Sequence, residues 1–429
     1  MSGQMKTQTL IQALAARLAL PVRNADRKRA RLHVLDWAGC AIAGAREPAG
    51  RILHDTSEAG SAATAFLWGG LGNILEMDDV DKRAILHPGP SIIPAVLALS
   101  GGAEDADILD AVVRGYEATI RLGRATGAGH YAIWHSTGTC GAIGAAAACA
   151  SLLKLPEKQV AHALALALSQ SAGLWQTRHE PGSMGKQLHT ANAARAGVES
   201  ARLAANGFAG PLSLLEGQQG FFAAMCPGAD PENVLADYGP NWLIHQVSFK
   251  FWPACRHAHA AIDAALEAAG GVDLSSIQKV RVQTYADAIK FCDKPNPKTV
   301  IEAKFSLQHA VAVVIARGAP GLSDFSSEAI DDPVLANLRS KIEVSEGARY
   351  TAAYPAHFGS SVQIDADDPV LVEDAWGDPE HPISEDDLVA KAEALMEVGG
   401  ASSEQISSVL KAAGSDTGTL IGYLREIAL

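Results

Sequence analysis

The chain of 429 residues has a net charge of −13, and its composition excludes several classes of protein. Hydrophobic residues make up 48% of the chain and charged residues 19%, which is typical of a compact folded protein and not of a disordered one. An acidic chain without a run of lysine and arginine offers no basic face to a nucleic-acid backbone. We therefore expect a large core, no binding of nucleic acid, and local groups of cations for any anionic ligand.

The N-terminal region and the cysteines indicate a cytoplasmic protein. Leu10, Leu14 and Leu18 share one face of a predicted helix that ends before Pro21, and no signal-peptide pattern precedes it. The six cysteines are scattered without a CxxC pair, so neither a disulfide framework nor a zinc ribbon is predicted. No apolar run reaches the roughly 18 residues needed to span a bilayer, and we expect no membrane partner.

The middle of the chain changes from a helical to a mixed pattern. Up to residue 245, Ala-rich stretches such as CGAIGAAAACASLLKLP and TANAARAGVESARLAANG predict closely packed helices. In the segments 279–286 (KVRVQTYA) and 360–365 (SSVQID), apolar and polar residues alternate as they do in half-buried strands. After residue 374, SEDDLVAKAEALMEVGG and SSEQISSVLKAAG predict helices that begin at serine caps.

These patterns predict a mainly α protein with a large all-helical domain and a smaller α+β domain. The helical domain is expected to comprise residues 1–245 with 375–429. The α+β domain is expected to comprise residues 246–374.

Four segments gather titratable residues beside glycine, proline or aromatic residues. They are EMDDVDKRAILHPG (76–89), GHYAIWHSTGTCGA (129–142), QTRHEPGSMGKQLHTANAAR (176–195) and SFKFWPACRHAH (248–259). Taken singly, acids and lysines usually lie on a solvated surface, and we expect this of Asp81, Lys82 and Arg83. A lone histidine more often has a structural role, which we assign to His33, His54, His162 and His245.

Taken together, the four segments suit proton transfer next to a carboxylate. Lysine and arginine hold anionic groups and stabilise negative charge that develops at the α-carbon, while a histidine or a desolvated lysine moves the proton. Cys255, His257 and His259 alternate and could share a face of a strand as metal ligands, but the segment continues into a helical pattern. The sequence therefore predicts neither a metal site nor a redox cofactor.

Five of these stretches are also similar to the motifs of a known family. EMDDV…HPG, WHSTGTCGAIGAAAA, GKQLHTANAARAG, CRHAHAAIDAAL and AKFSLQHAVA resemble, in order, the motifs of the MmgE/PrpD family. The family includes 2-methylcitrate dehydratase, cis-aconitate decarboxylase and iminodisuccinate epimerase. The resemblance implies a helical domain, an α+β domain, a site in the cleft between them and usually a homodimer.

The resemblance also implies roles for particular residues. The positions that match catalytic residues of the family are His87, His135 and Lys186, with Asp78 and Asp79 beside them. The positions that match substrate-binding residues are Glu76, Lys250, Arg256, His257 and Lys304. Members commonly have aspartate where this chain has Glu76, and decarboxylase-type members have histidine where Cys255 aligns. The second difference argues against decarboxylation of cis-aconitate.

We therefore expect a cofactor-independent lyase, similar to 2-methylcitrate dehydratase, that transfers a proton α to a carboxylate on a small di- or tricarboxylate. The alternatives are an epimerase of a dicarboxylate such as iminodisuccinate, a cis-aconitate-type decarboxylase, and a non-catalytic protein that binds carboxylates. The sequence does not select one substrate, because pocket shape depends on side chains that meet only in the folded protein.

Overall fold

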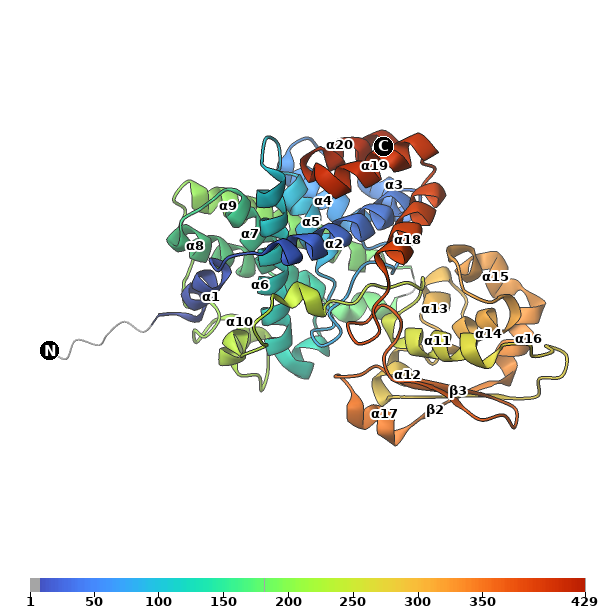
Figure 1. The fold of residues 1–429 in the computed structure, drawn as a ribbon. Coiled ribbons are helices and arrows are strands. Elements are labelled where there is room, and N and C mark those ends of the chain that lie inside the picture. The colour runs from blue at the N-terminus through green and yellow to red at the C-terminus, as the bar shows by residue number, and fades with distance from the viewer. Residues whose placement is uncertain (1–7, 181, 429) are drawn as a thin grey trace. The chain divides into compact units, whose positions relative to one another are not determined.

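The computed structural model describes residues 8–180 and 182–428, and the chain divides into two compact units. The first unit runs up to Val247 and includes the chain from Ser384 onward, and the second comprises Ser248–Ile383. Among the described residues there are twenty α-helices and one sheet of four strands (Figure 1). The predicted mainly α class is confirmed. No helix in the described part of the chain has both the length and the apolar composition of a membrane span.

The first unit is helical throughout its regular structure. Its N-terminal helices are α1 (Leu10–Leu18), α2 (Asn24–Gly44), α3 (Pro48–Asp55), α4 (Ser61–Leu71), α5 (Gly89–Leu97), α6 (Asp105–Tyr131), α7 (Ser136–Leu152), α8 (Glu157–Leu168), α9 (Gly185–Ala205) and α10 (Phe221–Met225). The chain returns to this unit with α18 (Glu385–Val398), α19 (Ser403–Ser415) and α20 (Leu420–Ala428).

Small residues allow the central helices to pack closely. Every residue of α7 except Ser151 is buried, and α7 packs against both α6 and α9. At the α6–α7 crossing, a Cβ atom on Gly115 would lie 2.9 Å from the Gly144 carbonyl oxygen, and one on Gly144 would lie 2.8 Å from the Gly115 oxygen. A side chain at either position would force the two backbones apart, because atoms in a packed core have no room to move aside. This packing holds the N-terminus of α7 in place.

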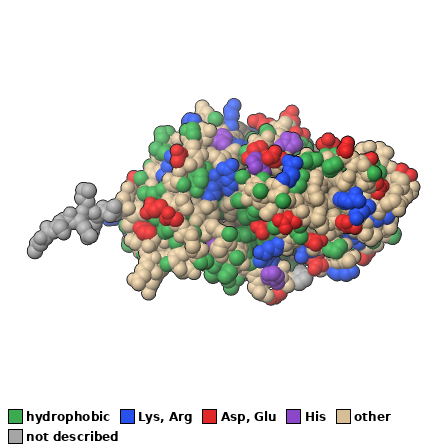
Figure 2. Space-filling view, turned by 90° about the horizontal axis from the view of Figure 1, so that it is seen from below, with side chains coloured by type: hydrophobic (Ala, Val, Ile, Leu, Met, Phe, Trp, Pro, Cys, Tyr) green, Lys and Arg blue, Asp and Glu red, His purple; other side chains and the backbone are tan. Residues whose placement is uncertain are grey.

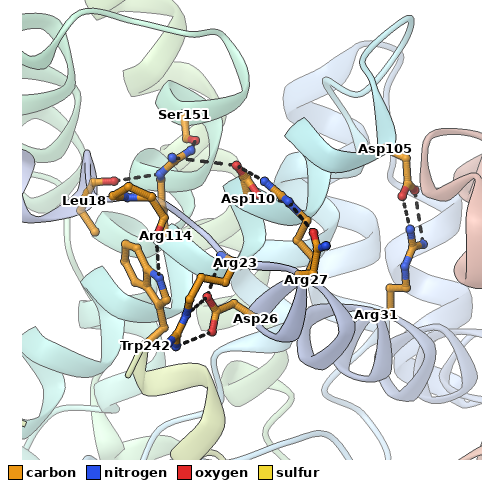
Figure 3. A network of polar contacts seen from close by, with 12 residues as sticks. Leu18, Arg23, Asp26, Arg27, Arg31, Asp105, Asp110, Arg114, Ser151 and Trp242 are labelled. Carbon is orange, nitrogen blue, oxygen red and sulfur yellow. Dashed lines mark hydrogen bonds and ion pairs between the residues drawn. The ribbon is translucent and has the colours of Figure 1, made fainter. Parts of the chain in front are cut away.

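Arginines attach α2 and α6 to their neighbours (Figure 3). Arg27 on α2 forms an ion pair with Asp110 on α6, with 2.6 Å between Nε and Oδ1. Arg114 on α6 donates to the Leu18 carbonyl oxygen at the end of α1 over 2.8 Å and to Ser151 Oγ on α7 over 2.7 Å. These side chains are partly exposed, so each pair stabilises the unit only modestly, by about 1 kcal/mol or less.

The C-terminal helices belong to the first unit, where α18 packs against α2. Ser384 and Asp387 form a capping box at the start of α18, and Ser402 and Gln405 form one at the start of α19. These are the serine caps that the sequence predicts. The buried face of α18 includes a lysine, Lys391, which reaches the candidate site described below.

The second unit combines helices with the small sheet. Its helices are α11 (His259–Ala268), α12 (Ala286–Cys292), α13 (Val300–Lys304), α14 (Leu307–Arg317), α15 (Ser327–Asp331), α16 (Pro333–Lys341) and α17 (Ala348–Ala353). Its strands are β1 (Val280–Thr284), β2 (Ile342–Glu346), β3 (Ser360–Ile364) and β4 (Val370–Val372). The order is β2-β1-β3-β4, with β1 parallel to β2 and antiparallel to β3.

Strands β1 and β3 lie where the alternating pattern predicts them. Along β1, Val280, Val282 and Thr284 are buried and the two residues between them are exposed, so one face of the strand packs on the core of this unit. Strand β2 has no such alternation and was not predicted.

On the surface face shown in Figure 2, acidic and basic side chains are interspersed.

Candidate active site

The loop between α4 and α5, residues 72–88, carries four of the predicted site residues. It contributes Glu76, Asp78, Asp79 and His87, and all three of these acids are buried. A buried carboxylate must be paired, because leaving it without a partner costs several kcal/mol. The partners of these acids therefore define what each one does.

Asp79 is held within the first unit by three donors. His33 Nδ1 lies 2.7 Å and the Tyr116 hydroxyl 2.6 Å from its Oδ2, while the backbone N–H of Gly89 donates to Oδ1 over 2.9 Å. Burial lowers the pKa of His33 to about 4, with Asp79 acting in the opposite direction. Asp79 thus fixes the loop to α2, α5 and α6, and His33 has the structural role expected for it.

His87 is oriented through its Nδ1 atom. This nitrogen lies 2.9 Å from the Asp79 carbonyl oxygen and 3.0 Å from Asp78 Oδ2. A carbonyl oxygen only accepts, so Nδ1 carries the proton and Nε2 is the atom at which His87 can exchange one. Asp78 is itself held by Asn73, whose side-chain N–H donates to Oδ2 over 2.7 Å.

His135 lies at the N-terminus of α7 and is almost fully buried. Its backbone N–H donates to the Gly173 carbonyl oxygen over 2.8 Å, and its ring packs against Trp175 with 4.5 Å between ring centroids. Among the described residues Nε2 has no hydrogen-bond partner. Burial, assisted by the positive charge of Lys186, lowers the pKa of His135 well below its usual value. The ring is therefore neutral at pH 7.

His87 and His135 are neighbours because the loop and α7 are joined. The Thr137 hydroxyl, in the first turn of α7, accepts a hydrogen bond from the His87 backbone N–H over 3.0 Å. The charge of His87 also contributes to the lowered pKa of His135. The structure thus brings together two histidines that lie 48 positions apart in the sequence.

Lys186, in the first turn of α9, forms an ion pair with the Glu76 carboxylate. Glu76 has a backbone φ of 61°, in the left-handed region that residues other than glycine rarely adopt. Backbone conformations of this kind cost on the order of 1–3 kcal/mol and persist where the surrounding structure enforces them, often at functional sites. The longer side chain at this position thus reaches Lys186 from a strained backbone.

A buried ion pair anchors the same loop from behind. Lys391 Nζ lies 2.5 Å from Asp36 Oδ1 and donates to the Met77 carbonyl oxygen over 2.7 Å. The two charged side chains are only 2% and 1% exposed. Because Met77 lies between Glu76 and Asp78, this contact fixes the backbone that carries both acids. The sequence motifs gave no indication of it.

Two of the three loop residues expected on a solvated surface are instead buried. Asp81 and Lys82 are 0% and 3% exposed, and only Arg83 lies on the surface as predicted. Asp81 accepts from Arg124 of α6, with 2.5 Å from Nη2 to Oδ2 and 3.1 Å from Nε to Oδ1. The prediction was wrong because the partner of Asp81 lies 43 positions further along the chain.

In the second unit, Arg256 and His257 lie in a short 3₁₀ turn before α11. The Arg256 guanidinium forms an ion pair with Asp378, which raises the pKa of Arg256 against the effect of burial, and it lies over the Phe358 ring. Among the described residues its Nε and Nη1 atoms are buried without a hydrogen-bond partner. These N–H groups are suited to a carboxylate.

The same unit holds the other predicted cations. Lys250 and Lys304 are buried, and the Lys304 carbonyl oxygen accepts from the backbone N–H of Cys255 over 2.8 Å. His257 Nδ1 lies 2.6 Å from the Tyr285 hydroxyl. Burial, with the charges of Arg256 and Lys250, lowers the pKa of His257 to about 3. The turn thus combines a neutral histidine with nearby cations.

The residues considered as metal ligands have other partners. His259 Nε2 bonds to the Ala254 carbonyl oxygen, and His257 bonds to Tyr285. Oxygen atoms of Asp374, Asp378 and Glu380 approach within 4.8 Å of one another. Of these, Asp378 already pairs with Arg256, so the protein's own cation partly neutralises the cluster.

One contact of the site was not predicted. His189, on α9 one turn after Lys186, places its Nδ1 3.2 Å from Nδ1 of His135. Burial, together with Lys186, lowers the pKa of His189. The spacing of Lys186 and His189, three residues apart on a predicted helix, was the available signal, since such residues share a helix face.

Comparison with known proteins places the chain in a family. The model of the MmgE/PrpD N-terminal domain matches residues 52–234, and that of the MmgE/PrpD C-terminal domain matches residues 252–413. The chain belongs to the MmgE/PrpD family. The two matches cover most of the chain, and the five ordered motifs fall within them.

Similar members of the MmgE/PrpD family are named as lyases. The cis-aconitate decarboxylase of Aspergillus terreus is 26% identical over 367 residues, which cover 75% of this chain and 74% of that protein. The cis-aconitate decarboxylase of Homo sapiens is 27% identical over 304 residues, covering 65% and 60%. The 2-methylcitrate dehydratase of Escherichia coli is 26% identical over 221 residues, covering 49% and 45%.

Proposed function

We propose that this MmgE/PrpD protein is a cofactor-independent lyase that removes water from a small di- or tricarboxylate by proton transfer α to a carboxylate. The observation that carries the proposal is His135, a buried and neutral histidine whose Nε2 has no partner among the described residues. The names of its relatives, which include decarboxylases and dehydratases, support the same class of reaction.

His135 is the proposed base. Its lowered pKa keeps Nε2 unprotonated at neutral pH, so the atom can accept the proton on the carbon next to a carboxylate. The electron pair left on that carbon forms a double bond to the neighbouring carbon. The hydroxyl group on the neighbouring carbon then leaves.

His87 is the proposed acid. With Nδ1 directed at Asp78 and the Asp79 carbonyl oxygen, a proton on Nε2 can pass to the departing hydroxyl, which leaves as water. One proton is gained by His135 and one is lost by His87, so the reaction is balanced. The ammonium group of Lys186 stabilises the negative charge that develops next to the substrate carboxylate.

The cations of the second unit are proposed to bind carboxylates of the substrate. Two buried nitrogen atoms of Arg256, Nε and Nη1, have no hydrogen-bond partner in the described structure, and each can donate a charge-assisted hydrogen bond to a carboxylate oxygen. Lys250 and Lys304 are the other two cations, and the neutral His257 is proposed to bind a substrate carboxylate by a hydrogen bond. The proposed steps use only these side chains, so the proposal includes no cofactor. The family resemblance further leads us to propose a homodimer, which light scattering of the purified protein would test, and the sequence leads us to propose a cytoplasmic location.

The experiment is a mass-spectrometric screen of small di- and tricarboxylates with the wild-type protein in D2O. Loss of water from one of the acids, abolished in His135→Ala and in Lys186→Met but not in the control His54→Ala, supports the proposal. His54 is an exposed histidine of α3, so its replacement tests for an effect of histidine removal alone.

Other results of the screen would overturn the proposal. Loss of CO2 would indicate a decarboxylase. Uptake of deuterium without loss of water or CO2 would indicate an epimerase. Stabilisation of the protein by an acid that it never converts would indicate a binding protein. Full turnover in folded His135→Ala would show that another group is the base.

A further inference from the structure

His135 also contacts His189, which has no role in the proposed lyase reaction. Its Nδ1 faces Nδ1 of His189 at 3.2 Å, and the ring centroids are 5.4 Å apart. Two ring nitrogens at this distance share one proton, because one must donate and the other accept. The ring of His135, whose Nε2 is the proposed base, is therefore connected through its Nδ1 to the ring of His189.

Two glycines make room for the histidine pair. A Cβ atom on Gly173 would lie 3.2 Å from His189 Nδ1 and 3.6 Å from His135 Cβ, and Gly173 has a φ of 136°. A Cβ atom on Gly138 would lie 2.9 Å from His189 Cβ. A side chain at Gly138 would therefore require His189 or the backbone to shift, and one at Gly173 would be both crowded and strained by the positive φ. The absence of a side chain at these two positions leaves room for the contact between the rings.

His189 also lines a cavity of about 230 Å³ in the first unit. The cavity is lined partly by alanines and partly by polar residues, which include Gln170, Asn192, Arg195 and Glu199. Arg195 and Glu199 are exposed on α9, so the cavity is accessible from the surface. Its volume accommodates several water molecules, since a water occupies about 30 Å³ in the liquid.

We propose that His189 is a proton-relay residue that carries the proton between His135 and this cavity. The inference rests on the proposed function, in which His135 accepts a proton at Nε2. As that proton arrives, His135 passes the proton on its Nδ1 to Nδ1 of His189, and His189 releases the proton on its own Nε2 to water in the cavity. One proton enters and one leaves, and each ring ends as the other neutral tautomer.

The relay avoids a charged ring in a place that disfavours it. His135 is buried beside Lys186, and an imidazolium there would be both desolvated and repelled. His189 is only half-buried, so positive charge that develops on its ring during the transfer is better solvated there than on His135. Charged or titratable groups near the pair include Lys186 with its partner Glu76, His87, and Arg195 and Glu199 on the cavity wall. After product release, exchange with water returns the rings to their starting tautomers.

The kinetic test uses His189→Ala, His189→Gln and a control, Asn192→Ala, which alters the cavity wall only. In dilute buffer, His189→Ala should lower kcat at least about tenfold with little change in KM, since a positioned proton-transfer group contributes about 10²–10⁴-fold. Imidazole should restore kcat as its concentration rises, because it fits the space left by the missing ring. Asn192→Ala should retain the wild-type kcat.

Two kinetic results would overturn the relay. Unchanged kcat of His189→Ala in dilute buffer would show that the proton leaves by another route. Recovery in His189→Gln without added imidazole would show that His189 only positions His135 by hydrogen bonding.

A measurement without turnover separates the relay from the proposed function. In protein labelled with ¹⁵N-histidine, the ring nitrogens of His135 and His189 should shift together as the pH is varied, and His189→Gln should change the tautomer of His135. If His189 titrates while the His135 signals stay fixed, the relay is wrong even for an active lyase. If the signals move together but no acid is converted, the relay stands and the proposed lyase reaction fails.

Discussion

Replacing Lys391 by methionine is expected to destabilise the first unit and to disturb the loop that carries Glu76 and Asp78. The substitution keeps a side chain of similar length but removes the ammonium group, whose Nζ lies 2.5 Å from Asp36 Oδ1 in the wild type. The Asp36 carboxylate is then buried without a cation. Breaking a buried pair by removing one partner costs about 3–5 kcal/mol. The Met77 carbonyl oxygen also loses its donor.

The loss of stability caused by Lys391→Met should depend on pH. Burial already raises the pKa of Asp36 from 3.8 to about 6 against the opposing effect of Lys391, and removing the lysine raises it further. A carboxyl group whose folded-state pKa is raised favours folding while protonated, and this contribution disappears as the pH rises through that pKa. Lys391→Met should therefore lose more stability at pH 8 than at pH 5.

Urea unfolding followed by far-UV circular dichroism at both pH values measures these losses. In the matched double variant Asp36→Leu with Lys391→Met, most of the stability should return, because an apolar pair of similar volume replaces a buried ion pair at little cost. A Lys391→Met loss below about 1 kcal/mol at pH 8, or a larger loss at pH 5, would refute the reasoning.

Three further outcomes are expected. Tyr116→Phe, which removes the 2.6 Å bond to the Asp79 carboxylate, should lower the free energy of unfolding by about 1.5–3 kcal/mol in urea. A tricarboxylate at about 100 times its Kd should stabilise the wild type by about 2.7 kcal/mol, seen as a rise in Tm, and Arg256→Gln should abolish the rise. Because the pKa of His135 is lowered, kcat/KM should stay constant as the pH falls from about 7.5 to about 6.5. An ordinary histidine base would be half protonated at about pH 6.5.

Each of these outcomes has a control or a contradicting result. Tyr423→Phe, at an exposed tyrosine, should leave stability unchanged, and an equal loss there would argue against the Asp79 bond. Arg317→Gln, which breaks partly exposed ion pairs in the second unit, should keep the ligand-induced rise in Tm. A kcat/KM that halves at pH 6.5 would contradict a neutral His135.

The fold could be predicted where local patterns decide it. The amphipathic α1, the serine caps of α18 and α19 and the alternating strands β1 and β3 all follow from residues close together in the sequence. Strand β2 could not be predicted in this way. It is extended because its backbone pairs in register with β1, about 60 positions earlier, and not because of its own pattern of side chains.

The candidate site could be predicted only in its types of residue. Motifs indicated His87, His135 and Lys186, and the structure joins these residues through Thr137 and Glu76. The partners from distant segments had no local signal. Lys391 lies 355 positions from Asp36, and a charged residue on α18 resembles a surface lysine until the helix packs. The same reason explains why Asp81 was expected on the surface.

The central claim is that His135 removes the proton from the carbon next to a carboxylate. The most direct measurement uses the converted acid with deuterium at that carbon, in ordinary water, with the wild type and His135→Ala compared by mass spectrometry under single-turnover conditions. The account predicts that the wild type releases the deuterium as it forms product and that folded His135→Ala leaves it in place. Release of the deuterium by His135→Ala at the wild-type rate would contradict the account.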